Sequence, residues 1–297
     1  MSAKKFKGTG VALVTPFKKD KSIDFDALEK LVNHVIENGV NYLVALGTTA
    51  ETPTLSKEEK IDVLNFIIKI NNNRLPLVCG IGGNNTQEVI ELLKKYPLEH
   101  VDAILSVSPY YNKPTQAGII AHFKEISKHS PIPIILYNVP GRTGSNMLAS
   151  TTLTLAKECK NIIAIKEACG NMAQSMELVQ NLPEDFTILS GDDDLAIAQI
   201  AIGFDGVISV AANCFTNDFS TMISESLKHN FVAAKKLHYK LLNGISLLFT
   251  EGNPPGVKAV LHKMDICENE CRLPVVPVSD DTSMKIDLFL KDALITF

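Results

Sequence analysis

The segment IPIILYNVPGRTGSNMLASTTLTLAKECKNIIAIKEACG, residues 132–170, contains the pattern that decides the fold. Two short and almost wholly apolar runs, residues 132–137 and 162–165, are separated by a more polar stretch. Continuously apolar strands are typical of parallel sheets, because helices cover the outer face of such sheets. The segment therefore predicts two parallel strands joined by a helix.

The same alternation of β-rich runs and amphipathic helices recurs along most of the chain. The predicted strands are residues 11–14, 42–46, 77–80, 103–107, 132–137, 162–165, 186–189 and 206–210. Eight such units within about 230 residues match the size of a (β/α)8 barrel, or TIM barrel, in the α/β class. The alternative is an open doubly wound sheet, which favours a glycine-rich phosphate loop after the first strand. Thr15, Pro16 and Phe17 follow that strand instead, so the barrel is the better prediction.

Helix signals agree with this division and change in character near the C-terminus. Residues 27–38 carry an apolar face and are followed by Gly39, a predicted C-terminal cap. Ser56 with Glu59 three residues later predicts a capping box. The alternation stops after about residue 227, and helices are predicted at residues 231–249, 254–263 and 282–294. We therefore expect a catalytic barrel over residues 1–226 and a helical extension over residues 227–297 that packs on it.

Composition narrows the class of protein and its partners. The chain has 297 residues, of which 45% are hydrophobic and 21% charged, values that are ordinary for a globular protein. A net charge of -4 argues against a nucleic-acid or membrane-surface partner. No segment approaches the roughly 20 apolar residues of a membrane-spanning helix, and the N-terminus has no signal-peptide pattern. Six cysteines without a CxxC pair predict free thiols and a cytoplasmic location.

The barrel prediction gives a shortlist for the active site, because these sites form where the barrel strands end. Lys166 directly follows the apolar residues 162–165, so its ammonium is expected to project into or beside an apolar barrel mouth. Desolvation disfavours the charged amine, and a neutral amine can attack a ketone to form an imine. The imine then stabilises an adjacent carbanion. The alternative is a lysine that extends past the strand end into water.

Other strand ends carry polar groups with two interpretations each. Tyr137 is placed either to relay a proton or to pack and hydrogen-bond the backbone. Thr48 and Thr49 either bind a carboxylate or a proton chain, or cap a local turn. Arg142 either clamps a carboxylate with its planar guanidinium or lies in solvent.

Two further clusters are expected to serve other purposes. Tyr110 and Tyr111 suit an oligomer contact, where tyrosines are enriched. The run of residues 192–194, three aspartates, superficially resembles a metal site. Consecutive side chains diverge and no histidine is near, so we expect a helix N-terminus that favours negative charge. We expect no metal.

Six motifs at successive strand ends carry a family resemblance: GTTAE (47–51), SPYYN (108–112), YNVPGRTG (137–144), IKEA (165–168), SGDD (190–193) and GVISV (206–210). In order and spacing they resemble the 4-hydroxy-tetrahydrodipicolinate synthase (dihydrodipicolinate synthase) family, and GNPPGVKAVL (252–261) resembles its C-terminal region. The resemblance implies condensation of pyruvate with L-aspartate 4-semialdehyde through a lysine Schiff base. This is a step toward diaminopimelate and lysine, without a cofactor and in a homotetramer built as a dimer of dimers.

The resemblance also implies a catalytic role for four residues. Lys166 matches the Schiff-base lysine, and Tyr137 matches the tyrosine that relays protons above the imine. Thr48 matches the hydroxyl that links this tyrosine to Tyr111, which the family donates across a subunit interface.

Four more positions match substrate-binding residues. Thr49 corresponds to the residue that holds the pyruvate carboxylate, and Arg142 to the residue that receives the semialdehyde carboxylate. Gly191 and Ile208 match positions that line the pocket. Two alternatives within the superfamily are N-acetylneuraminate lyase and another 2-oxo-acid aldolase, and Arg142 favours the synthase over the lyase. The non-enzyme alternative is a ligand-binding regulatory barrel.

A candidate effector site for L-lysine follows from the same resemblance. It comprises positions Asn84, Glu88, Tyr110 and Lys60. Lysine-sensitive members of the family commonly carry histidines where this chain has Lys57 and Lys60. The added positive charge predicts weak or absent inhibition by L-lysine.

Overall fold

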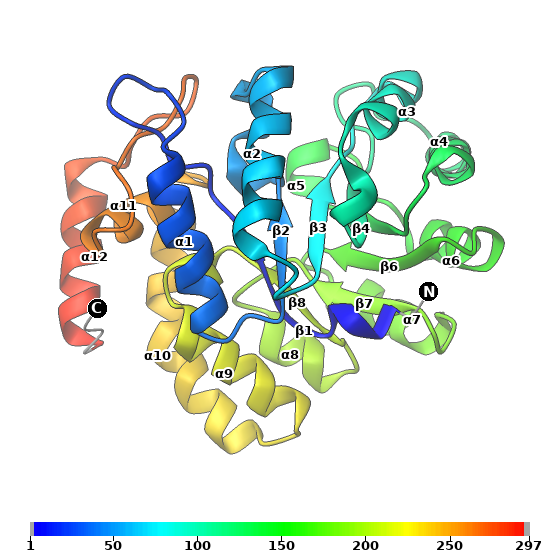
Figure 1. Ribbon diagram of the computed structural model, residues 1–297. Helices are drawn as coiled ribbons and strands as arrows, with labels where there is room; N and C mark the ends of the chain where they lie inside the picture. The colour runs from blue at the N-terminus through cyan, green and yellow to red at the C-terminus, as the bar shows by residue number, and fades with distance from the viewer. Residues whose placement is uncertain (1–2, 294–297) are drawn as a thin grey trace.

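A computed structural model describes residues 3–293 and contains a closed barrel of eight parallel strands in sequential order (Figure 1). The strands are β1 (Gly8–Ala12), β2 (Tyr42–Ala45), β3 (Leu77–Gly80), β4 (Ala103–Val107), β5 (Ile134–Asn138), β6 (Ile162–Glu167), β7 (Thr187–Ser190) and β8 (Gly206–Ser209). Pairing of β1 with β8 closes the barrel. The predicted (β/α)8 barrel is confirmed, and every predicted strand is present with ends shifted by at most three residues.

The largest shift is at β1, which begins at Gly8 rather than at residue 11. A glycine-rich start gives no apolar signal, but the tertiary structure requires Gly10. A β-carbon there would lie 2.1 Å from Cε2 of Tyr42, whose buried ring fills the barrel interior next to β1. Tyr42 in turn packs edge-on against Phe6, with ring centroids 5.6 Å apart.

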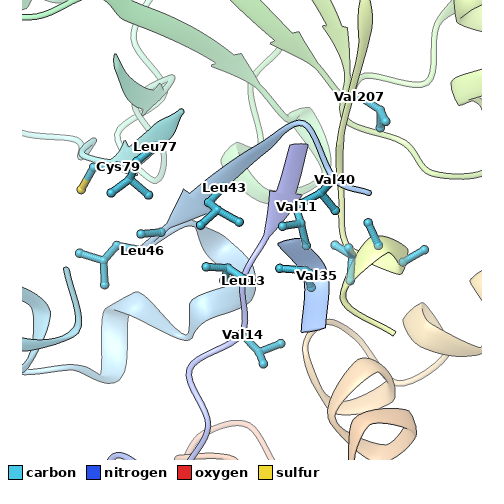
Figure 2. Packing of buried hydrophobic residues seen from close by; sticks show 14 of the residues in the cluster. Val11, Leu13, Val14, Val35, Val40, Leu43, Leu46, Leu77, Cys79 and Val207 are labelled. Carbon is cyan, nitrogen blue, oxygen red and sulfur yellow. The ribbon is translucent and has the colours of Figure 1, made fainter. Parts of the chain in front are cut away.

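The strands bury side chains on both faces, which explains their continuously apolar sequences. Inward-facing residues such as Val44, Ile135 and Leu189 form one cluster inside the barrel. Outward-facing residues such as Val11, Leu43 and Leu77 form a second, larger cluster under the helices (Figure 2).

Helices alternate with the strands and cover the outside of the barrel (Figure 1). They are α1 (Phe25–Glu37), α2 (Lys57–Asn71), α3 (Thr86–Lys95), α4 (Gln116–His129), α5 (Pro140–Thr143), α6 (Ala149–Glu158), α7 (Met172–Asn181), α8 (Ala196–Ala201) and α9 (Thr216–Leu227). The predicted capping box of Ser56 and Glu59 is present at the start of α2. Gly39 follows α1 with φ +93°, as the predicted C-terminal cap requires.

The C-terminal extension contains α10 (Phe231–Phe249), α11 (Pro255–Lys263) and α12 (Asp280–Asp292). α10 packs on α9, and α12 packs on α10. Apolar residues of α10 such as Leu241 and Leu248 belong to the same core cluster as the barrel helices. The predicted third helix ended at residue 294, which lies outside the described residues. The division between residues 226 and 227 falls in the last turn of α9 and stays a prediction.

Among residues 3–293, no helix has both the length and the apolar character needed to cross a membrane.

Candidate active site

A cleft opens at the C-terminal ends of the barrel strands. It consists of an inner cavity of about 350 Å³ and an outer cavity of about 440 Å³. Thr48, Tyr137, Arg142 and Asn253 line both cavities, so the two are continuous. Such a cleft suits small polar molecules and lies where barrel active sites form.

Lys166 lies inside β6 rather than after it, in register with Tyr137 on β5 and with Leu189 on β7. Its side chain is only 6% exposed and lines the inner cavity. The Nζ atom lies 4.4 Å from the centroid of the Tyr137 ring. No ion pair within residues 3–293 includes Lys166, although its charge acts on the nearby carboxylates of Asp192 and Asp193. This arrangement leaves the amine available to attack a carbonyl.

The residues next to Tyr137 and Lys166 point to the other face of the sheet and fix the two strand ends. Asn138 donates from Nδ2 to Oε1 of Glu167 over 2.9 Å, and Gln174 donates from Nε2 to Oε2 of Glu167 over 3.1 Å. Burial raises the pKa of Glu167, and these hydrogen bonds oppose the rise. Because alternate residues of a strand face opposite sides, this buried network helps to hold Tyr137 and Lys166 toward the cavity.

Gly191 follows β7 and leaves room for the lysine. A β-carbon there would lie 3.0 Å from Cε of Lys166 and 2.5 Å from Cβ of Ala168. Position 191 therefore requires a glycine for steric reasons, in agreement with its expected place in the pocket wall. Ile208, the other predicted wall residue, is 1% exposed and belongs to the barrel interior, whereas Val210 lines the cavity.

The three aspartates after β7 have separate environments. Asp193 is buried, and its Oδ2 accepts from the N–H groups of Val210 and Ala211 over 3.0 and 2.9 Å. Ala211 starts the 3-10 helix η5 (Ala211–Asn213), so this carboxylate does meet a helix start. That helix follows the neighbouring strand β8 and is not the next helix in sequence. Asp192 lines the inner cavity, and burial raises its pKa to about 6. Within residues 3–293, its Oδ2 is buried without a hydrogen-bond partner.

Thr48 and Thr49 lie in the 3-10 turn η2 (Thr48–Ala50) directly after β2. Thr49 is 2% exposed, and its Oγ1 accepts from Nδ2 of Asn253 over 3.0 Å. Local capping is performed by Thr52 and Thr54, whose hydroxyls donate to the carbonyls of Gly47 and Glu51. The hydroxyls of Thr48 and Thr49 are thus placed for the cleft rather than for the turn.

Arg142 lies in the short helix α5 and lines both cavities. In the described part of the chain, no carboxylate pairs with its guanidinium, which is exposed toward the cleft. A planar guanidinium without a protein partner suits bidentate binding of a ligand carboxylate.

Tyr111 does not join this group within one chain. It is 89% exposed and adopts a left-handed backbone conformation with φ +70°. Tyr110 is 42% exposed and lines the outer cavity, and its carbonyl accepts from Nδ2 of Asn84 over 3.2 Å.

The remaining residues of the predicted effector site are Lys60 and Glu88. Lys60 is half-buried and lines the outer cavity, and desolvation lowers its pKa, with a smaller contribution from the charge of Lys57. Lys57 and Glu88 are exposed in the first turns of α2 and α3. Lys60 therefore approaches the cleft, whereas Lys57 belongs to the solvated face.

Sequence reasoning missed the contribution of the C-terminal extension to the site. Asn253 lines both cavities and contacts Thr49, while Lys258 is fully buried in an ion pair with Glu51. The available signal was a single lysine in the otherwise apolar residues 254–261.

No group of three or more histidine, cysteine, aspartate or glutamate side chains in residues 3–293 is arranged to hold a metal ion.

Comparisons with known proteins agree with this geometry. The model of the dihydrodipicolinate synthetase family matches residues 5–293. The 4-hydroxy-tetrahydrodipicolinate synthase of Flavobacterium psychrophilum is 54% identical over 286 residues, covering 96% of this chain and 98% of that protein. The pyruvate-complexed crystal structure of dihydrodipicolinate synthase from Acinetobacter baumannii is 42% identical with a TM-score of 0.94, covering 98% of this chain and 99% of that one. A structure of the enzyme from Cyanidioschyzon merolae with lysine bound is 34% identical with a TM-score of 0.94, with the same coverage of both chains. The chain therefore belongs to the dihydrodipicolinate synthetase family.

Proposed function

We propose that this protein condenses pyruvate with L-aspartate 4-semialdehyde to form 4-hydroxy-tetrahydrodipicolinate, a step toward diaminopimelate and lysine. The observation that carries the proposal is the buried amine of Lys166, which faces the cleft and forms no ion pair within residues 3–293. Arg142, which lines the same cleft, supplies the positive charge that a second carboxylate substrate needs. The names of the relatives support the same activity.

The first half of the reaction uses Lys166 and Tyr137. The neutral amine of Lys166 attacks C2 of pyruvate, and loss of water leaves an imine. Removal of a methyl proton from the imine then gives an enamine. Tyr137, whose ring centroid lies 4.4 Å from Nζ, carries these protons. Thr49 binds the pyruvate carboxylate, and Gly191 keeps the space beside the lysine open.

The second half joins the two substrates. Arg142 binds the carboxylate of the semialdehyde. The enamine carbon attacks the aldehyde carbon, and the aldehyde oxygen takes a proton from the Tyr137 and Thr48 hydroxyl chain. The substrate amine then attacks the imine carbon, which closes the ring and releases Lys166 as an amine. No cofactor enters this sequence.

Borohydride reduction with pyruvate tests the covalent step directly. The reduced adduct should appear by mass spectrometry on the peptide that contains Lys166, and activity should be lost irreversibly. Lys166→Arg should form no adduct, because a guanidinium stays protonated. An unmodified Lys166 peptide in pyruvate-saturated protein would refute the proposal.

We also propose that the protein is a homotetramer, a dimer of dimers, in which Tyr111 completes the site of a neighbouring subunit. The 89% exposed Tyr111, next to the 42% exposed Tyr110, supports this, because tyrosines are enriched at protein interfaces. Mixed tetramers of Lys166→Ala and Tyr111→Phe chains should regain activity after subunit exchange. Inactive hybrids, verified by native mass spectrometry, would place Tyr111 outside the neighbouring site.

The remaining proposals concern regulation and location. L-Lysine should inhibit weakly or not at all, because Lys60 brings positive charge to the outer cavity beside Tyr110. A cytoplasmic location is supported by six cysteines that are all free thiols.

A further inference from the structure

The loop that carries Thr48 and Thr49 has a backbone that its own sequence does not favour. Two 3-10 turns, η2 and η3 (Thr52–Thr54), are joined by Glu51 in the left-handed conformation, with φ 52° and ψ 33°. This region crowds the β-carbon of any residue except glycine. The position of the loop therefore depends on contacts from elsewhere in the fold.

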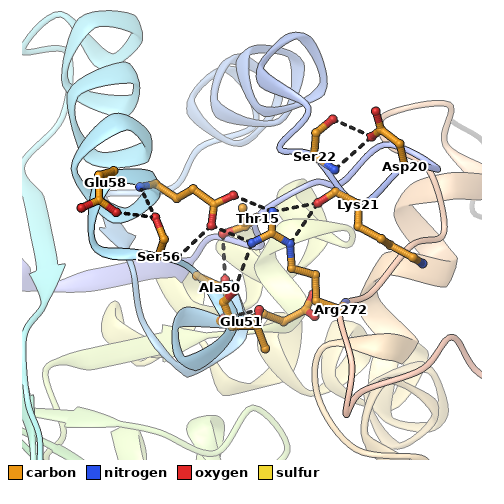
Figure 3. Close-up of polar contacts among 11 residues, drawn as sticks. Thr15, Asp20, Lys21, Ser22, Ala50, Glu51, Ser56, Glu58 and Arg272 are labelled. Carbon is orange, nitrogen blue, oxygen red and sulfur yellow. Dashed lines mark hydrogen bonds and ion pairs between the residues drawn. The ribbon is translucent and has the colours of Figure 1, made fainter.

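Those contacts come from the C-terminal extension. Lys258 on α11 is 0% exposed, forms an ion pair with Glu51, and lies 4.2 Å from the ring centroid of Phe17. The second carboxylate oxygen of Glu51 accepts from the backbone N–H of Arg272 over 2.9 Å (Figure 3). Neither buried charge can lose its partner cheaply. The pair therefore fixes the loop to the start of α11.

Arg272 extends the same attachment to α2. Its guanidinium makes two bonds of 2.6 and 2.7 Å to the carboxylate of Glu59. It also donates to the carbonyl of Lys21 (Figure 3). The Arg272 bond holds the pKa of Glu59 down at about 2. Both sides of the loop are thus held by residues that lie more than 200 positions later in the chain.

Asn253 lies just before α11, so the attachment of α11 to the loop places its side chain next to the Thr49 hydroxyl. Its Nδ2 donates to Oγ1 of Thr49 over 3.0 Å, and both residues line the inner cavity with Lys166. A threonine hydroxyl has one proton to donate and two lone pairs to accept with. The Asn253 amide uses a lone pair, which leaves the Thr49 proton to point to another acceptor.

A carboxylate in the cavity would be that acceptor, since it can only accept hydrogen bonds. The Oδ1 of Asn253 is buried and has no hydrogen-bond partner within residues 3–293. A buried acceptor without a partner is unfavourable for the fold, so a contribution to stability does not explain why the Asn253 side chain is buried here. Its orientation does serve Thr49.

We propose that Asn253 is a positioning residue of the pyruvate site, which holds the Thr49 hydroxyl as a hydrogen-bond donor to the substrate carboxylate. The Lys258–Glu51 ion pair keeps the two side chains at bonding distance. The proposal rests on the proposed function, because it takes the pyruvate carboxylate as the ligand of Thr49. It also makes the C-terminal extension a part of the active site.

The test is a double-mutant cycle on pyruvate binding, measured as the occupancy of the borohydride-trapped adduct at Lys166 against pyruvate concentration. Asn253→Ala and Thr49→Val should each raise the apparent dissociation constant about tenfold, as expected for a lost bond to a charged group. The double variant should bind pyruvate no more weakly than the weaker-binding of the two single variants, because both substitutions remove the same hydrogen-bond donor. Asn253→Asp should weaken pyruvate at least as much, since it replaces the amide donor with an acceptor that competes for the Thr49 proton.

Several readouts separate this role from a merely structural one. The KM for the semialdehyde should change much less than the KM for pyruvate in Asn253→Ala. Asn181→Ala, which removes an exposed asparagine bonded to the Glu177 carbonyl, should leave both KM values unchanged. Additive effects in the cycle, or an unchanged dissociation constant in folded Asn253→Ala, would overturn the proposal and leave the proposed function intact. Absence of any adduct in the unaltered protein would overturn both.

Discussion

Replacing Gly191 with alanine measures how closely the fold packs around Lys166. A β-carbon at this position would lie 2.5 Å from Cβ of Ala168 and 3.0 Å from Cε of Lys166. Non-bonded carbon atoms are most favourable at about 3.5–4.0 Å, so the neighbours must move apart by about 1 Å. Ala168 has no flexible side chain to turn aside and directly follows β6. The displacement therefore passes to the strand end that carries Lys166.

Gly191→Ala should change the rate of the reaction at Lys166 strongly and the free energy of unfolding only slightly. A shift of about 1 Å in a reacting group costs on the order of 100-fold in rate, whereas overpacking costs about 1–3 kcal/mol of unfolding free energy. We therefore expect Gly191→Ala to slow borohydride trapping of pyruvate about 100-fold, with a melting temperature only a few degrees lower. Stopped reactions analysed by mass spectrometry give the rate, and thermal unfolding gives the stability.

Gly83→Ala is a matched control in the loop after β3. A β-carbon there would meet the Cγ2 atom of Val89 at 3.4 Å, an ordinary contact, so both the rate and the melting temperature should be unchanged. An unchanged trapping rate in folded Gly191→Ala would refute the packing argument, because it would show that the cleft admits the methyl group without moving Lys166.

Three further predictions follow from charges in the cleft. Arg142→Ala should raise the KM for the semialdehyde by 10-fold or more and the KM for pyruvate much less, because the desolvated carboxylate of the semialdehyde loses its bidentate partner. Steady-state kinetics with each substrate varied would show equal effects on both KM values if Arg142 were structural. L-Lysine should inhibit weakly at subsaturating pyruvate, because Lys60 and an ammonium group of L-lysine about 4 Å apart would repel by about 4 kcal/mol at an effective dielectric near 20. Lys60→His should increase inhibition, and strong submillimolar inhibition of the unaltered enzyme would contradict the argument. Asp192→Asn should raise the unfolding free energy above pH 6, because the folded-state pKa of about 6 exceeds the ordinary value of 3.8 and ionisation therefore destabilises the fold. The difference corresponds to about 3 kcal/mol, reduced to about 1–2 kcal/mol by solvent contact. This gain should vanish as the pH falls toward 4. Denaturant titration at both pH values measures it, and the exposed Asp185→Asn should show no gain at either pH.

The barrel could be predicted from the sequence, because parallel strands covered on both faces consist of short apolar runs. Helix starts were equally legible where the signal is local, as at Ser56 and Glu59, whose side chains bond each other's backbone within one turn. The first strand was displaced because Gly8 and Gly10 give no apolar signal. Gly10 is required by the Tyr42 ring and Gly8 by the Asn41 side chain, contacts that local sequence does not reveal.

Lys166 and Lys258 mark the boundary between the two kinds of information. Each is a single lysine in an apolar run. From the sequence we expected a nucleophilic role for Lys166, with a lysine that reaches water as the alternative, and no role was predicted for Lys258. Lys258 is neutralised by Glu51, a residue 207 positions away, whereas Lys166 faces a cavity without such a partner in residues 3–293. Likewise, the contact of Asn253 with Thr49 spans 204 positions. Tertiary structure alone decided these pairings, because the energy of a buried charge depends on which distant group the fold brings to it.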